Sequence, residues 1–288
     1  MELSMQIGQY QLRQKLGEGD MGTVFVAQSI QTSEQVAIKV LNKIDVQSAM
    51  DRGAAAEILD FAASIQHPIL HPILEVIDTD IDGGMLAVVM PLAAASIGDF
   101  FAQGKPIPPK HHLRIIDTVI EGLQFLHDQE VAHGSLKPTN ILVDRGGNPT
   151  ITDLAMAHIR DFGLVPRQAT LLQEHYIFTD RLFNSTPELA ADIFALATFI
   201  YQLLTGGRLP FSDPRSEVRK VEQPSAEGLS PLVHSVLLRG LTHRKELAYP
   251  DLAAFAADFH SALQGKIDPE TKRWFSVDTN TSSLDEEE

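Results

Sequence analysis

The chain has 288 residues, of which 44% are hydrophobic and 21% are charged, and its formal net charge at pH 7 is -15. This length is sufficient for one large domain or two lobes, and the hydrophobic fraction argues against wholesale disorder. The acidic balance disfavours binding to a phosphate backbone, so we expect no nucleic-acid partner. The absence of cysteine excludes disulfides, thiolate catalysis and cysteine-ligated metal centres.

The N-terminal part of the chain, residues 1–92, has the pattern of a small β-rich region. Short segments rich in Val, Ile and Phe, separated by glycine or polar turns, predict strands. These segments are Tyr10 to Leu16, Thr23 to Ile30, Gln35 to Leu41, Leu74 to Asp78 and Met85 to Met90. The last two flank Asp82-Gly83-Gly84, which is typical of a hairpin turn. The alanine-rich segment from Ala49 to Ile65 predicts a helix.

After Leu92 the pattern becomes mainly helical, with one further hairpin. Apolar residues at helical spacing predict helices at His112 to Asp128, Leu189 to Leu204, Leu229 to Leu241 and Leu252 to Leu263. The segment from Leu189 to Leu204 is apolar on nearly every face, so we expect it to be buried all round. Two short strands, Ile141 to Val143 and Thr150 to Thr152, predict a hairpin that turns at Gly146-Gly147.

The ends of the chain carry no targeting or membrane signal. The most apolar run, Ile193 to Leu204, is too short to span a bilayer, and the N-terminus lacks the pattern of a signal peptide. We therefore expect a soluble cytoplasmic protein with no membrane span. We expect a helical region at residues 93–265 and a disordered acidic tail at residues 266–288, where five acidic residues follow Val277 without a basic one.

The segment Gly17-Glu18-Gly19-Asp20-Met21-Gly22 is rich in glycine. Glycines let the backbone turn sharply and bring its N–H groups close to phosphates. A glycine-rich hairpin without a ligand is the commoner explanation of such a pattern. A dinucleotide-binding loop requires a helix after it, whereas Thr23 to Ile30 predicts a strand. Lys39 follows Gly17 by 22 residues on the next strand and can point into the same cleft.

Together with this loop and Lys39, three later motifs resemble those of protein kinases. The segment from His133 to Asn140 resembles the catalytic loop, Asp153-Leu154-Ala155 the metal-binding tripeptide, and Asp192 the buried acid below that loop. The chain thus resembles the bacterial relatives of eukaryotic Ser/Thr kinases from Tyr10 to Leu263. The resemblance implies an α+β, two-lobed protein-kinase-like fold. Its N-lobe is a small antiparallel β-sheet with one main helix, and its larger C-lobe is mostly helical.

Two further matches concern alternatives to these assignments. Asp161-Phe162-Gly163 spells the metal-binding tripeptide outright, but Asp153 directly follows the predicted hairpin strand, as in the family, so we assign the role to Asp153. His67-Pro68-Ile69 resembles the turn after the regulatory helix of the family. This match favours a structural role for His67 and His71 over a metal-binding pair.

The resemblance implies a site for ATP and magnesium. Lys39 would pair with the α- and β-phosphates under the glycine loop, and Lys137 would lie near the transferred phosphate. At the hinge, the carbonyl of Pro91 would accept a hydrogen bond from the adenine amino group, and the N–H of Ala93 would donate to the ring. The implied ATP-binding positions are Leu16, Gly17, Gly19, Gly22, Val24, Ala37, Lys39, Glu57, Pro91, Ala93 and Leu142. The implied metal ligands are Asn140 and Asp153, which offer the oxygen atoms that magnesium prefers.

The glutamate that would pair with Lys39 is not fixed by the sequence. Glu57 is the best candidate, but it lies one position too early when counted back from His67. A one-residue insertion or a helix bulge would restore the match; otherwise Asp60 or no residue takes the role.

The catalytic loop departs from that of an active kinase. His133-Gly134-Ser135 stands where the family has His-Arg-Asp, so Ser135 replaces the aspartate that orients the substrate hydroxyl and accepts its proton. We assign His133 a structural role. Three hypotheses follow: a pseudokinase that binds ATP and acts on a protein partner, an active Ser/Thr protein kinase with a non-standard catalytic loop, and an interaction domain without nucleotide. The replacement at Ser135 argues against the second, and the intact nucleotide-binding residues argue against the third. The partner or substrate and the oligomeric state are not predicted.

Overall fold

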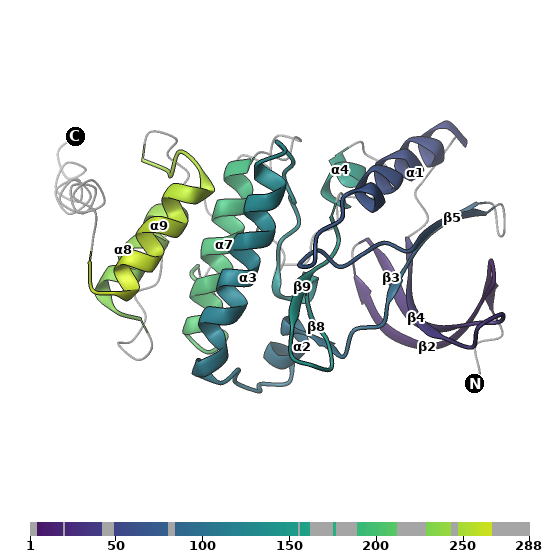
Figure 1. Cartoon of the computed structure of the whole chain (residues 1–288), viewed down its shortest axis with the longest axis horizontal. Coiled ribbons are helices and arrows are strands. Elements are labelled where there is room, and N and C mark those ends of the chain that lie inside the picture. The colour runs from purple at the N-terminus through teal and green to yellow at the C-terminus, as the bar shows by residue number, and fades with distance from the viewer. Residues whose placement is uncertain are drawn as a thin grey trace, which may run out of the picture. The chain divides into compact units, whose positions relative to one another are not determined.

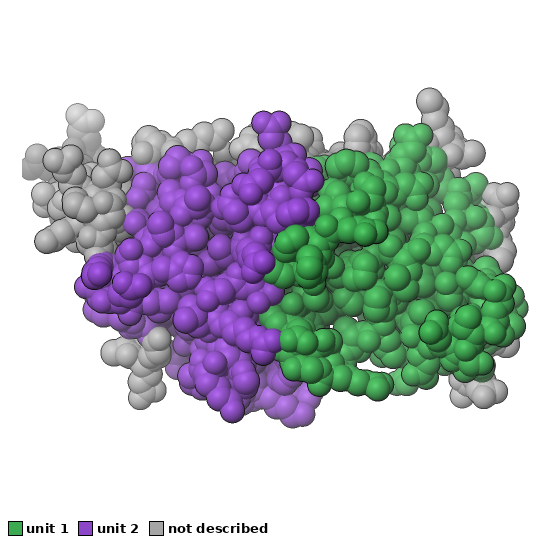
Figure 2. All heavy atoms as spheres, in the orientation of Figure 1, with its two compact units in different colours: residues 1–99, 133–172, 185–187 green, residues 100–132, 173–184, 188–288 purple. Residues whose placement is uncertain are grey.

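The computed structural model describes residues 5–19, 21–41, 49–79, 84–154, 156–161, 175–176, 189–211, 229–242 and 247–266. The chain divides into two compact units (Figure 2). Unit 1 comprises residues 1–99, 133–172 and 185–187, and unit 2 comprises residues 100–132, 173–184 and 188–288. The predicted hairpin after residue 140 therefore groups with the N-terminal strands, although the sequence placed it in the helical region.

Unit 1 is built on an antiparallel six-stranded sheet with the order β1-β2-β3-β4-β6-β5 (Figure 1). Side chains alternate across a strand, so β4 and β6 divide their residues between two apolar clusters. Ala37 and Val88 belong to the cluster beside the helix α1, whereas Ile38 and Val89 belong to the cluster with β1 and β2. The strands are β1 (Gln6–Ile7), β2 (Tyr10–Gly19), β3 (Gly22–Ser29), β4 (Gln35–Leu41), β5 (Glu75–Thr79) and β6 (Met85–Pro91).

The helix α1 (Ala49–Ser64) covers one face of this sheet. Its alanine-rich sequence favours a helix, and Ala55 and Leu59 are fully buried. A short helix, α4 (Met156–Asp161), contributes Met156 and Ile159 to the same cluster. The sequence did not predict α4, because a helix of six residues is too short to show a helical periodicity of apolar residues.

A second, three-stranded sheet completes unit 1. It has the order β7-β8-β9 and comprises β7 (Ala95–Ser96), β8 (Ile141–Val143) and β9 (Pro149–Ile151). The predicted hairpin is thus confirmed as β8 and β9, and an isolated bridge joins Leu70 to Ile151. The helix α2 (Ile97–Ala102) begins directly after β7. A 3-10 turn, Pro138–Asn140, leads into β8.

Unit 2 consists of helices in the part of the chain that the structure describes (Figure 1). Every residue from Ala191 to Leu203 is buried, which confirms the prediction for that helix. Gly240 allows close packing, because a Cβ there would lie 2.8 Å from the Cβ of Ala197 and 2.9 Å from the Phe255 ring. The helices are α3 (Pro109–His127), α7 (Leu189–Leu204), α8 (Pro231–Gly240) and α9 (Leu252–Leu263).

Several sequence predictions lie outside the described residues. These are most of the turn at Asp82-Gly83-Gly84, the positions of Ala155, Phe162 and Gly163, and the acidic tail beyond Lys266. Among the helices that are described, none is both long enough and apolar enough to cross a membrane.

Candidate nucleotide-binding site

The glycine-rich segment forms the end of the β2–β3 hairpin. Gly17 faces Val24 across the ladder, and Gly19 faces Gly22. Gly22 has a φ of 156°, and a Cβ there would lie 2.2 Å from the carbonyl oxygen of Val40, so this position requires glycine. At Gly17 and Gly19 the space beside the backbone is open, because a Cβ would meet no atom within 4 Å. At Gly17 and Gly19 the hairpin therefore leaves its backbone uncovered by side chains, which suits a phosphate-covering loop.

The apolar residues expected around adenine come from both sheets of unit 1. Leu16 and Val24 lie on the hairpin, Ala37 on β4 and Leu142 on β8. Ala37 is buried, Val24 and Leu142 are half-buried, and Leu16 is 52% exposed. An exposed leucine on a hairpin provides apolar surface for a ring without disturbing the core.

Lys39 forms a buried ion pair with Asp153. Lys39 lies opposite Val24 on β4, and its Nζ is 2.5 Å from Oδ2 of Asp153. The two side chains are only 8% and 10% exposed. Burial alone raises the pKa of Asp153, but the ammonium of Lys39 outweighs it, and the pKa lies below the ordinary value. Lys137 and His133 lower this pKa further. Both partners are therefore charged, and each neutralises the other.

Neither candidate on α1 takes part in this ion pair. Glu57 and Asp60 are both exposed, whereas the helix presents Ala55 and Leu59 to the core. The expected pairing of Lys39 with Glu57 is thus not formed in this structure. The physical reason is the helical phase: a residue two positions after a buried one lies well around the helix from it.

The catalytic-loop segment is hydrogen-bonded to the residues around Asp153. The hydroxyl of Ser135 donates to the backbone carbonyl of Asp153 at 2.9 Å. Asn140 Nδ2 donates to the carbonyl of Ser135 at 2.7 Å, and the fully buried His133 uses Nε2 toward the carbonyl of Thr152 at 3.0 Å. Asp153 itself has a φ of 67°, a left-handed conformation that aspartate tolerates better than most residues. These bonds therefore fix the loop and the Asp153 backbone to each other.

The oxygen atoms expected to bind magnesium are both in unit 1. Because Nδ2 of Asn140 donates to the backbone, its Oδ1 would be the ligand atom; Oδ1 accepts from the Thr139 hydroxyl at 3.4 Å and retains a second lone pair. Asp153 supplies a charged carboxylate, and its backbone carbonyl accepts from the Ser135 hydroxyl. One carboxylate and one amide oxygen are typical of a magnesium ion that takes its remaining ligands from phosphates and water. This donor set fits the metal.

The hinge segment has a partner that the sequence did not predict. His71 Nε2 lies 2.9 Å from the carbonyl oxygen of Pro91, and Oγ1 of Thr150 lies 3.3 Å from its Nδ1. Burial lowers the pKa of His71, although the Pro91 carbonyl and the charge of Asp153 act in the opposite direction. The structural role expected for His71 is thus specified as a contact with the hinge.

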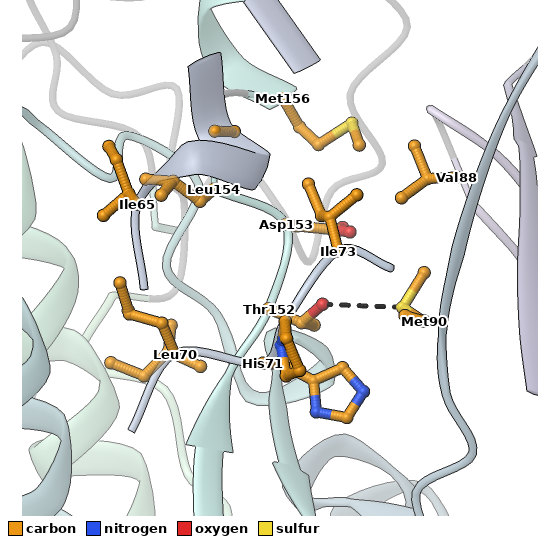
Figure 3. A pocket seen from close by; sticks show the side chains of 13 residues that line it. Ile65, Leu70, His71, Ile73, Val88, Met90, Thr152, Asp153, Leu154 and Met156 are labelled. Atoms are coloured by element: carbon orange, nitrogen blue, oxygen red, sulfur yellow. Dashed lines mark hydrogen bonds between the residues drawn. The ribbon is translucent and has the colours of Figure 1, made fainter. Parts of the chain in front are cut away.

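A pocket lies between β6, α1 and the segment that contains Asp153 (Figure 3). Its lining is mostly apolar, and Thr152 and Asp153 are among its polar residues. The side chain of Met90 lies at its edge, 3.8 Å from the Thr152 hydroxyl. The lining residues are Ala62, Ile65, Leu70, His71, Pro72, Ile73, Val88, Met90, Ile151, Thr152, Asp153, Leu154 and Met156.

Comparison with known families agrees with these features. The sequence profile of the family described as "Protein kinase domain" matches residues 10–241. The chain belongs to the protein kinase family. The α+β kinase fold expected from the sequence is confirmed, with an antiparallel sheet in one part and helices in the other.

Several kinases of bacteria and yeasts are similar to the chain. Serine/threonine-protein kinase PrkC of Bacillus subtilis is 28% identical over 239 residues, which is 78% of this chain and 35% of PrkC. Serine/threonine-protein kinase PknB of Mycobacterium tuberculosis is 24% identical over 288 residues, 96% of this chain and 46% of PknB. The chain thus spans between about a third and a half of the length of these relatives. Among solved structures, the PknI kinase domain of M. tuberculosis has a TM-score of 0.69 at 19% identity, covering 92% of this chain and 99% of that one.

Unit 1 contains all the positions that the kinase motifs single out for nucleotide and metal. The glycine loop, Lys39, the hinge, the segment from His133 to Asn140 and Asp153 all fall within its residues. Asp192 belongs to unit 2, where it is fully buried and accepts a hydrogen bond from His127 Nε2 at 2.9 Å. The contact of His71 with the hinge was missed, because a histidine after a His-Pro turn gives no signal of its own.

Proposed function

We propose that this kinase domain binds ATP with magnesium and transfers phosphate weakly or not at all, so that it acts as a regulatory or scaffolding module. The observation that carries the proposal is the position of Ser135. The residue stands where the family has its catalytic aspartate, and its hydroxyl hydrogen bonds to the backbone of Asp153. A neutral serine hydroxyl is a far weaker base than a carboxylate, so it accepts the proton of a substrate hydroxyl poorly.

The nucleotide-binding part of the proposal rests on the charged groups of unit 1. Lys39 and Asp153 neutralise each other in the absence of ligand. When bound, magnesium supplies charge neutralisation for the phosphates. Lys39 would exchange the carboxylate of Asp153 for phosphate oxygens, and Asp153 and Asn140 would hold the metal. Since both charges keep a partner in either state, the exchange does not leave a buried charge uncompensated.

The loss of the aspartate sets the expected rate. A general base contributes about 10²–10⁴-fold, and protein kinases turn over at about 1–100 s⁻¹. A domain without that base would retain on the order of 10⁻⁴–1 s⁻¹. Positioning and charge neutralisation carry most of phosphoryl transfer, so weak activity is compatible with the proposal.

The alternative is an active Ser/Thr protein kinase. The names of the relatives favour it, because PrkC and PknB are both called serine/threonine-protein kinases. In this case water, Asp153 or another carboxylate would replace the missing base. In both cases the protein that the domain acts on is unidentified, and the net charge of -15 favours a partner with a basic surface.

The test measures binding and transfer on the same sample. Thermal unfolding is recorded with ATP in the presence of Mg²⁺ or of a chelator, and the protein is then incubated with labelled ATP and dephosphorylated casein. We expect a rise in Tm that requires Mg²⁺ and little labelling of casein. If ATP does not raise Tm, the binding claim fails. Casein labelling at about one turnover per second or faster, abolished by Lys39→Met, would establish the active kinase instead.

A further inference from the structure

We propose that His71 determines how the site reads the nucleotide base: it donates a hydrogen bond to the hinge carbonyl of Pro91 and so competes with the 6-amino group of adenine, which then adds little to binding. This inference rests on the proposed nucleotide binding and concerns its specificity. The expected acceptor for the amino group is the carbonyl of Pro91, and the structure gives this carbonyl a donor from the protein itself, at 2.9 Å.

The hydrogen bonds around the ring define its tautomer. The carbonyl oxygen of Pro91 can only accept, so Nε2 carries the proton and donates it. In a neutral imidazole Nδ1 then has a lone pair, and the hydroxyl of Thr150 at 3.3 Å donates to it. The lowered pKa of His71 agrees with a neutral ring. The hydrogen bonds therefore run in one direction, from the hydroxyl of Thr150 to the ring of His71 and from this ring to the carbonyl of Pro91.

The backbone holds His71 firmly in this place. Its N–H donates to the carbonyl of Ile151 at 2.8 Å, and the preceding residue, Leu70, forms the bridge to the same strand position. Thr150 lies on β9, where it pairs with Leu142 of β8. The strand that carries Thr150 thus positions the His71 backbone, and the contacts of the ring with Thr150 and Pro91 hold the imidazole.

The other hinge group remains open to the base. Among the described residues, none accepts a hydrogen bond from the N–H of Ala93. Pro91 has no N–H, so its carbonyl is the only backbone hydrogen-bonding group at that position. The hinge therefore offers one donor for N1 of a purine and a carbonyl that already accepts one hydrogen bond from the protein.

The experiment compares ATP with purine riboside 5′-triphosphate in the full chain. The second nucleotide lacks the 6-amino group but keeps N1 as an acceptor, so the contact with Ala93 is unchanged. For the wild-type protein we expect Kd values within about twofold of each other. A neutral hydrogen bond to an unoccupied carbonyl is worth about threefold to tenfold in Kd. In His71→Val we therefore expect ATP to bind about threefold to tenfold more tightly than purine riboside triphosphate.

Two further variants separate specificity from general damage. His71→Gln retains an N–H donor near the position of Nε2 and should restore the wild-type ratio. His67→Gln changes a neighbouring histidine, whose Nδ1 accepts from the N–H of Ile69 at 3.4 Å, and should leave the ratio unchanged.

The outcomes distinguish this inference from the proposed function. If neither nucleotide binds, the proposed function fails and the inference falls with it. If both bind and the wild-type protein prefers ATP by about threefold or more, only the inference is overturned. The wild-type ratio is sufficient for this decision, so a variant that fails to fold does not prevent the test.

Discussion

Lys39 and Asp153 form a buried ion pair in which each residue is the other's counterion. Their side chains are nearly inaccessible, and the pKa of Asp153 stays below its ordinary value despite its burial. Removing one member of such a pair leaves an uncompensated charge, which costs about 3–5 kcal/mol. The same two residues are the ones that nucleotide and metal would separate, so the ligand-free state keeps them charged and in place.

Replacement of Lys39 by Met should therefore destabilise the ligand-free protein by about 3–5 kcal/mol in the free energy of unfolding. The physical cause is that the buried carboxylate of Asp153 loses its ion-pair partner. Urea unfolding of Lys39→Met, Asp153→Asn and the double variant measures the coupling between them. The exposed pair of Lys15 and Glu18 is the control, since its side chains are 49% and 62% exposed, and Lys15→Met should cost less than about 1 kcal/mol. Equal losses for the two lysines would contradict the assigned role.

The hydrogen bond from the Ser135 hydroxyl to the backbone carbonyl of Asp153 gives a second prediction. Restoring the family aspartate by Ser135→Asp removes the donated hydrogen bond and places a carboxylate near the carbonyl oxygen of Asp153. We expect this variant to be less stable than Ser135→Ala, which itself should lose only about 0.5–1.5 kcal/mol with the hydrogen bond, because the Asp153 carbonyl still accepts from the N–H of Met156 at 3.3 Å. Denaturant unfolding of both variants tests the order. An Asp variant as stable as the wild type and active on casein would instead favour the alternative of an active kinase.

The buried imidazole of His71 links stability to pH. Its pKa is lowered, so the unfolded chain takes up a proton near pH 6.5, before the folded protein does. This contribution to stability is complete above about pH 6.5 and is lost as the pH falls below that value. The difference in the free energy of unfolding between the wild type and His71→Gln should be larger at pH 7.5 than at pH 5.5. The charge of Asp153 raises the pKa of His71 and so opposes the effect of burial. Asp153→Asn removes this charge and should therefore make stability depend more strongly on pH.

At the scale of elements, the contact between α2 and the catalytic loop depends on a glycine. A Cβ at Gly98 would lie 2.5 Å from Cγ2 of Thr139 and 3.0 Å from two of its backbone atoms. Gly98→Ala should therefore displace the loop and weaken both stability and nucleotide binding. Gly53 in α1 is the matched control, because a Cβ there meets nothing within 4 Å. Gly53→Ala should stabilise the protein by about 0.5–1 kcal/mol through helix propensity. Thermal unfolding of both variants tests whether Gly98→Ala lowers Tm while Gly53→Ala raises it.

The elements with a strong pattern could be predicted from the sequence, and the short ones could not. The alternation in Gln35 to Leu41 and the apolar run from Leu189 to Leu204 gave the bounds of β4 and α7 correctly. The two-residue strands β1 and β7 offer too few positions for any periodicity. Within the site, motif spacing indicated Lys39 and Asp153, but not that they pair with each other. The phase of α1, which leaves Glu57 exposed, depends on packing that the sequence does not display.

At the scale of the whole chain, the residues assigned to nucleotide and metal gather in unit 1. A ligand that binds only the folded state stabilises it by about 2.7 kcal/mol at a concentration of 100 Kd. Hydrogen exchange with ATP and Mg²⁺ should thus slow most at the β2–β3 hairpin and at the segment from His133 to Asp153. Protection confined to the helices α8 and α9 would place the ligand elsewhere.

The division of unit 1 into separate stretches of chain has a consequence for biosynthesis. Its first 99 residues leave the ribosome before the segment that begins at His133, with residues 100–132 of unit 2 between them. Domains fold as units, so unit 1 is not complete until the segment that contains Asp153 has been synthesised. Until then Lys39 lacks the carboxylate that is its counterion in the folded protein. The last step in the folding of unit 1 is therefore the pairing of β8 and β9 after their synthesis. Nascent chains that stall before this point should remain bound to chaperones.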